Sequence, residues 1–76
     1  MSTQDSNRDA AERLKVLGNK LHQNGEYQGA YAKYSEAIQK DSKNAILYAN
    51  RAASSLALKK YGAFFLQTMY KDLTPF

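Results

Sequence analysis

The sequence resembles itself when it is shifted by 34 residues. Positions of similar character then coincide: Ala11 with Ala45, Leu14 with Tyr48, Gly18 with Ala52, and Tyr27 with Tyr61. Self-similarity at a period of this order is typical of arrays in which one small supersecondary unit is stacked on its copy. A chain of 76 residues has room for at most two such units. The repeat therefore restricts the fold to a short array.

Apolar residues recur at helical spacing in three segments, and no segment shows the sustained alternation of a strand. We predict an all-α chain with antiparallel helices over about 9–24, 27–40 and 45–58, preceded by a flexible segment, 1–8. A capping box at 6–9 should start the first helix, and Asn24-Gly25 should end it. The turn-forming residues 41–44 should end the second. The expected inner stripe of the second helix is Ala30, Tyr34, Ala37 and Ile38.

Gly18 lies in the middle of the first predicted helix, where glycine is about 1 kcal/mol less favourable than alanine. It belongs to an apolar stripe that should pack on the second helix, made of Leu14, Leu17, Gly18 and Leu21. The shifted copy also has a small residue at this position, Ala52. We infer that a small side chain here lets the partner helix approach closely. On the third helix, Tyr48, Ala52, Ser55 and Leu56 should share one side.

A 34-residue helix-turn-helix unit with the spacing L-x-x-L-G-x-x-L and then A-x-x-x-Y-x-x-A resembles the tetratricopeptide repeat. One complete repeat would cover about residues 11–44, and the first helix of another about 45–58. The proline that usually ends the unit is replaced by Ser42. The resemblance implies about one and a half to two repeats, whose first helices together line a concave groove.

A second face of the first helix carries Lys15, Asn19 and His22, about 120° away from the leucine stripe. In a tetratricopeptide array this face would line the groove, together with Asn50 of the third helix. The stretches Leu14-Lys15-Val16-Leu17-Gly18-Asn19 and Tyr48-Ala49-Asn50-Arg51-Ala52 resemble the carboxylate clamp of co-chaperones of the heat-shock-organising and small glutamine-rich types. A plain solvated helix face is the alternative.

The co-chaperone resemblance implies a peptide-binding site made of Lys15, Asn19 and Asn50. Its expected partners are the C-terminal Glu-Glu-Val-Asp tails of heat-shock protein 70 and 90 class chaperones. A terminal Asp presents two carboxylates, which suit a lysine ammonium and two asparagine N–H donors. The family takes two further basic residues from a third repeat, which these 76 residues do not contain. We therefore expect an incomplete clamp. The loss of two charge-assisted hydrogen bonds should weaken binding by ~3–6 kcal/mol.

Other functions find less support in the residues. The serines lack a His/Asp constellation and no glycine-rich phosphate loop exists, so we expect no enzyme and no cofactor. His22 is the one histidine and should be a surface residue, without a metal site. Arg51 should make an ion pair or stack. The chain has no cysteine and no apolar run that could span a membrane, and we expect a cytoplasmic protein. A net charge of +4, spread along the chain, leaves nucleic-acid binding as the weakest alternative.

The last segment, 61–76, departs from the repeat pattern but is amphipathic. Its large apolar residues are too widely spread for one buried stripe, which indicates an interface. The candidate interface residues are Phe64, Phe65, Leu66, Met69, Tyr70 and Leu73. We therefore predict a truncated repeat protein that self-associates as a homodimer, either through a separate fourth helix or through one fused helix over about 45–72.

Overall fold

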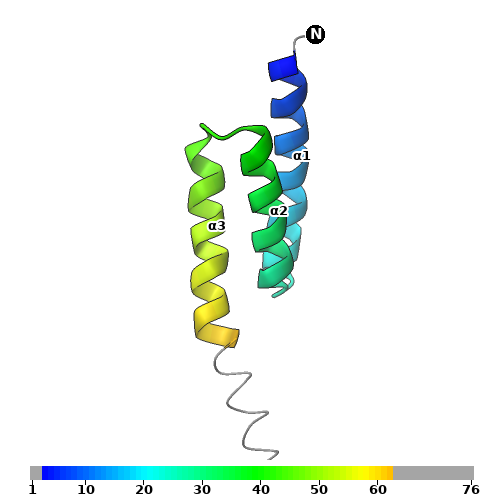
Figure 1. Cartoon of the computed structure of the whole chain (residues 1–76). Helices are drawn as coiled ribbons and strands as arrows, with labels where there is room; N and C mark the ends of the chain where they lie inside the picture. Colours follow the sequence, from blue (N-terminus) through cyan, green and yellow to red (C-terminus); the bar gives the residue numbers. More distant parts are fainter. Residues whose placement is uncertain (1–2, 63–76) are drawn as a thin grey trace, which may run out of the picture.

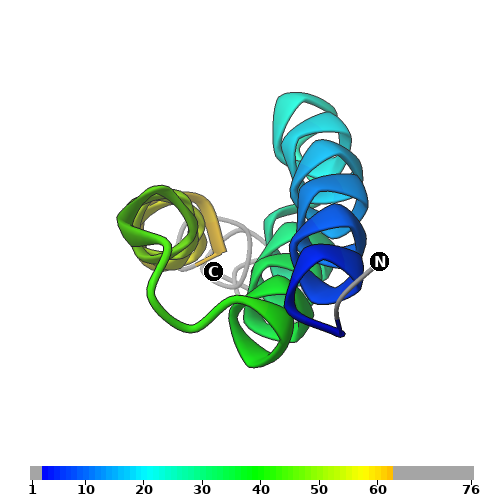
Figure 2. The ribbon, with the colours of Figure 1, turned by 90° about the horizontal axis from the view of Figure 1, so that it is seen from above.

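A computed structural model describes residues 3–62 of the chain and the side chains of residues 6–60. It contains three α-helices, α1 (Thr3–Gln23), α2 (Tyr27–Lys40) and α3 (Ala45–Ala57), and a π-helical segment, η1 (Leu58–Gly62). The described residues contain no strand, so the predicted all-α, helix-turn-helix architecture is confirmed. Consecutive helices run antiparallel, with α2 beside both α1 and α3 (Figures 1 and 2).

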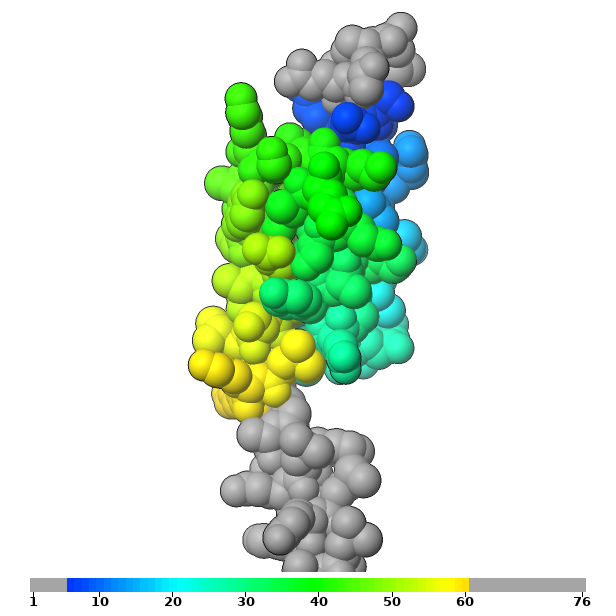
Figure 3. All heavy atoms as spheres, in the orientation of Figure 1, coloured from blue at the N-terminus to red at the C-terminus, as the bar shows by residue number. Residues whose placement is uncertain are grey.

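The core lies on the inner stripe of α2, as predicted. Its buried members are Ala30, Tyr34, Ala37 and Ile38. Ala11 and Leu47 reach this stripe from the two flanking helices, and Leu14 packs against it. Because α2 contacts a helix on each side, its small residues let both neighbours come close. Figure 3 shows the side chains of α2 and α3 in continuous contact on one face of the molecule.

Helix α1 begins at Thr3, six residues before the predicted start at 9. The predicted capping box at 6–9 lies inside the helix, so the expectation that it starts the helix was wrong. Polar residues at 3–9 are compatible with a helix that needs no packing on its first two turns, since the apolar stripe begins only at Ala11. Residues 3–8 of the segment predicted to be flexible are thus part of α1.

The predicted stop at Asn24-Gly25 is present. Gly25 has φ +81°, a left-handed conformation that glycine adopts without steric cost. The Glu26 N–H donates to the Leu21 carbonyl at 2.8 Å, and the Gly25 N–H donates to the His22 carbonyl at 3.0 Å. These two bonds form a Schellman motif, which satisfies carbonyls that the end of α1 leaves free. The motif turns the chain back so that α2 runs antiparallel to α1.

The predicted break at 41–44 is also present, and Asn44 supplies the cap of α3. Its side-chain oxygen accepts from the Ile46 N–H at 3.0 Å. The Tyr48 hydroxyl donates to the Ser42 carbonyl at 2.8 Å, which ties the first turn of α3 back to the loop. This short connection places α3 against α2.

Two predicted stripes include residues that stay exposed in the structure. Leu17, expected to pack on α2, is 47% exposed, because no described helix covers its side of α1. Tyr48 and Leu56 do share one side of α3, but they are 42% and 67% exposed, whereas the buried face of α3 carries Leu47 and Ser54. Spacing correctly grouped these residues and did not say which group would be covered.

The helical backbone continues past Ala57 without a break. The Leu58 N–H bonds to the carbonyls of Ser54 and Ser55, and η1 carries the chain to Gly62. The predicted interface residues between 64 and 73 lie outside the described residues. Within the described part, no helix is long and apolar enough to cross a membrane.

Candidate functional site

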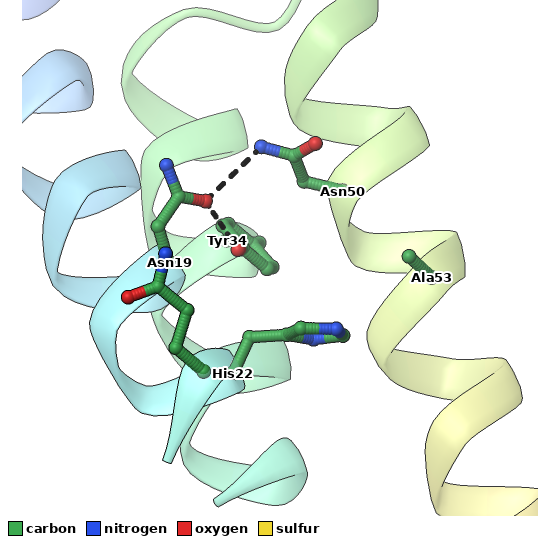
Figure 4. Close-up of a pocket in the computed structure, with 6 residues that line it drawn as sticks. Asn19, His22, Tyr34, Asn50 and Ala53 are labelled. Atoms are coloured by element: carbon green, nitrogen blue, oxygen red, sulfur yellow. Dashed lines mark hydrogen bonds between the residues drawn. The ribbon is translucent and has the colours of Figure 1, made fainter. Parts of the chain in front are cut away.

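A pocket of about 200 Å³ opens between α1 and α3, above the middle of α2 (Figure 4). It is lined by Asn19, His22, Gln23, Tyr34, Asn50 and Ala53. Two of the three predicted site residues, Asn19 and Asn50, thus come together across the pocket although they are 31 positions apart. The lining contains no Lys, Arg, Asp or Glu, and two of its side chains, His22 and Tyr34, can titrate.

Asn19 is the centre of a small hydrogen-bond network. Its Oδ1 accepts from the Tyr34 hydroxyl at 2.5 Å and from Asn50 Nδ2 at 3.4 Å. With Oδ1 occupied from two helices, the amide orientation is set, and Nδ2 lies on the other side of the group (Figure 4). The two Nδ2 hydrogens are then free to donate to a ligand.

Tyr34 supports this network from below. Its ring is 2% exposed, and burial raises the pKa of the Tyr34 hydroxyl above its usual value of 10.0. The hydroxyl therefore remains protonated at neutral pH and serves as a donor to Asn19. With Tyr34 and Asn50 both donating to Asn19 Oδ1, the amide nitrogen is the group of Asn19 that can meet an anion.

Gly18 explains how Tyr34 reaches Asn19. A Cβ atom at Gly18 would lie 2.6 Å from Tyr34 Cε1 and 2.8 Å from Tyr34 Cδ1, closer than real Cβ atoms approach other atoms. The tyrosine ring thus packs directly on the backbone of α1, next to the residue that its hydroxyl contacts. The inference that Gly18 permits a close approach of the second helix is confirmed, and the approach also builds the pocket.

Lys15 is not among the pocket-lining residues. It lies one helical turn before Asn19, and its Nζ pairs with Glu12 Oε2 at 3.1 Å, with the two side chains 20% and 60% exposed. An ion pair of this kind at i, i+3 on a helix contributes only a few tenths of a kcal/mol. The ammonium can therefore leave Glu12 for a stronger anionic partner at little cost.

His22 was expected on the surface, but it is half-buried and lines the pocket. Its Nδ1 lies 2.9 Å from the Ser54 Oγ of α3, and its ring meets Tyr27 edge-on with centroids 5.0 Å apart. In the sequence, the pocket position of His22 was indicated by its place on the same helical face as Asn19, one turn away. The hydrogen bond to Ser54 could not be read from spacing alone.

Arg51, adjacent to Asn50, has a structural role. Its guanidinium carbon lies 5.6 Å from the ring centroids of both Tyr31 and Tyr48, and Nη1 donates to Ser35 Oγ at 3.3 Å. Of the two predicted roles of Arg51, an ion pair or stacking, the structure shows stacking. These contacts link α3 to α2 and turn the charge away from the pocket lining.

Comparison with known proteins places this geometry in context. A family model described as a TPR repeat matches residues 18–61, which is more than half of the chain. The chain is 53% identical over 51 residues to small glutamine-rich tetratricopeptide repeat-containing protein 2 of Saccharomyces cerevisiae, a match that covers 67% of the chain and 15% of the relative. No solved structure matches the chain significantly.

Two further relatives match a similar stretch of the chain. The chain is 38% identical over 55 residues to the Hsp70-Hsp90 organising protein of Plasmodium falciparum, across 72% of the chain and 22% of the relative. It is 40% identical over 55 residues to stress-induced-phosphoprotein 1 of Caenorhabditis elegans, across 72% of the chain and 17% of the relative. The chain thus spans less than a quarter of the length of each of these proteins.

Proposed function

Because the chain belongs to the tetratricopeptide-repeat family, we propose that it is a protein-interaction module whose groove binds acidic C-terminal peptides. The observation that carries the proposal is the pair Asn19 and Asn50, which meet across the pocket with amide N–H groups available. The proposed partners are the Glu-Glu-Val-Asp tails of heat-shock protein 70 and 90 class chaperones. The name of the Hsp70-Hsp90 organising relative supports this choice.

The chemistry of the pocket suits a chain terminus. A C-terminal Asp carries its α-carboxylate and its side-chain carboxylate close together, and carboxylates are acceptors only. Asn19 Nδ2 and the second Nδ2 hydrogen of Asn50 supply donors with fixed directions. Lys15, released from Glu12, supplies a charge beside them. These groups would bind an anion, and no catalytic step is proposed.

We expect this binding to depend on both Asn50 and Lys15. In a fluorescence titration with a peptide ending in Glu-Glu-Val-Asp, Asn50→Ala and Lys15→Ala should each weaken binding by about tenfold, as expected for one hydrogen bond to a charged group. Lys33→Ala is the matched control, because Lys33 forms the same type of i, i+3 pair with Glu36 at 3.2 Å but is not in the pocket lining. A loss as large for Lys33→Ala would contradict the proposed site.

We also propose that two copies of the chain associate through the exposed side of α3 and the residues that follow it. Tyr48 and Leu56 are exposed apolar side chains on α3. Further large apolar residues follow α3 in the sequence, at 64–73. Exposed apolar patches of this kind usually mark interfaces. The helical backbone through η1 suits the fused-helix route as far as Gly62, and the separate-helix route remains the alternative beyond it.

The dimer is tested by the mass of the chain in solution. Light scattering at high micromolar concentration should give twice the monomer mass. Leu56→Glu and Phe65→Glu should each lower the measured mass, because a buried carboxylate would oppose association. A monomer mass for the unmodified chain would contradict the dimer without affecting the pocket. Cytoplasmic location stays a prediction, and so does nucleic-acid binding as the weakest alternative.

A further inference from the structure

We propose that His22 forms a proton-dependent subsite of the groove, in which the protonated ring takes a second carboxylate of the bound acidic peptide. The inference rests on the proposed function of the pocket and adds a residue to it. His22 lies one helical turn after Asn19 and lines the same pocket as Asn19 and Asn50. A peptide anchored on the two asparagines would therefore pass the imidazole.

The ring is held in place from two other helices. Ser54 of α3 engages Nδ1 at 2.9 Å, and Tyr27 of α2 meets the ring edge-on at 5.0 Å between centroids. Ser54 is fully buried, so water has little access to its hydroxyl and does not readily replace the imidazole as its hydrogen-bond partner. A ring fixed at Nδ1 presents Nε2 as its remaining polar atom, and no described residue hydrogen-bonds Nε2.

The protonation state decides how strongly Nε2 can bind an anion. In the neutral ring, Nε2 is an acceptor if Nδ1–H donates to Ser54, and an uncharged N–H donor if Nδ1 accepts from the Ser54 hydroxyl. In the protonated ring both nitrogens donate, and the serine hydroxyl can act as the acceptor that this state requires. Protonation therefore gives the ring a charged N–H donor at Nε2, and a charged donor makes a stronger contact with an anion than a neutral one.

The charged groups around His22 leave the peptide as the main source of negative charge. From α2, Tyr27 and Tyr34 face the ring or the pocket as neutral phenols, and Lys33 and Glu36 pair with each other. From α3, Asn50 and Ser54 are neutral, and Arg51 is turned toward Tyr31 and Tyr48. On the same helix lie Lys15 and Lys20, and Glu26 follows in the turn.

The sign of the pH dependence follows from this arrangement. A bound carboxylate stabilises the protonated ring, so the peptide complex holds more protons than the free protein. Binding must then tighten as the pH falls through the range near 6.5 in which imidazole titrates, and weaken as the pH rises above it. The peptide carboxylates stay ionised in this range, because they titrate near pH 4.

The test combines peptide titration with nuclear magnetic resonance of the single histidine, at constant ionic strength. A peptide ending in Glu-Glu-Val-Asp should bind about fivefold more tightly at about pH 6 than at about pH 7.5, and its addition should move the His22 titration midpoint to higher pH. His22→Gln, which retains a side chain able to bond Ser54, should remove the pH dependence. Asn50→Ala should weaken binding at both pH values and keep their ratio.

The outcomes separate the two levels of the proposal. Equal binding at both pH values with an unmoved His22 midpoint would overturn the subsite and leave the asparagine pocket standing. A pH ratio that persists in His22→Gln would also overturn it. No binding at either pH would overturn the subsite together with the proposed function. The midpoint measurement uses the unmodified chain, so it does not depend on how a variant folds.

Discussion

Replacing Gly18 with alanine should lower the melting temperature, even though alanine is the better helix former. The added methyl carbon would lie 2.6 Å and 2.8 Å from two ring atoms of Tyr34, and the ring is 2% exposed and cannot swing away. Overpacking of this kind opposes the propensity gain of about 1 kcal/mol with a cost of ~1–3 kcal/mol. We expect a net loss of up to about 2 kcal/mol, or up to roughly 15 °C in a domain of this size.

Gly29→Ala is the matched control for this experiment. Gly29 also lies inside a helix, but a Cβ atom there would meet Leu21 Cδ1 at 3.4 Å, an ordinary contact. This variant should be neutral or slightly more stable in a thermal melt followed by circular dichroism. Equal stabilisation by both alanines would contradict the close packing of Tyr34 on α1.

The variant Asn19→Asp should strongly weaken peptide binding while it leaves the fold intact. An aspartate oxygen can still accept from Tyr34 and Asn50, so the network inside the pocket is retained. The Nδ2 donor, however, is replaced by a negatively charged oxygen that faces the peptide carboxylates. Losing one donor and adding repulsion should weaken binding by about a hundredfold or more, which corresponds to ~3 kcal/mol.

Gln28→Glu controls for the added negative charge. Gln28 is exposed on α2 and is not part of the pocket lining, so this variant changes the net charge by the same amount outside the groove. It should bind the peptide almost as well as the unmodified chain. A similar loss in both variants would indicate that overall charge, rather than the orientation of Asn19, governs binding.

The fold was largely predictable because its central helix is unambiguous. Helix α2 has neighbours on two sides, so its apolar spacing and its buried stripe coincide. Leu17, Tyr48 and Leu56 show the limit of the same reasoning, because periodicity defines a face and not the element that covers it. The start of α1 was missed for a related reason: a good capping sequence at 6–9 does not prevent the helix from extending to Thr3.

The site was predictable in part. The resemblance to tetratricopeptide co-chaperones implied that Asn19 and Asn50 line one groove, and the structure brings them within 3.4 Å. It does not bring Lys15 into the pocket lining, since Lys15 pairs with Glu12 on the same helix. The roles of Tyr34 and His22 depend on side-chain contacts between helices, with Asn19 and with Ser54, and spacing alone does not determine such contacts.

The pocket's proposed role as a carboxylate-binding site is tested most directly by comparing two peptides that differ only at their last group. One ends in Glu-Glu-Val-Asp with a free C-terminal carboxylate, and the other carries an amide there. We expect weak but measurable binding of the free peptide and at least tenfold weaker binding of the amidated one, because amidation neutralises one of the two carboxylates that the asparagines and Lys15 would hold. Equal affinity for the two peptides would contradict the proposed site.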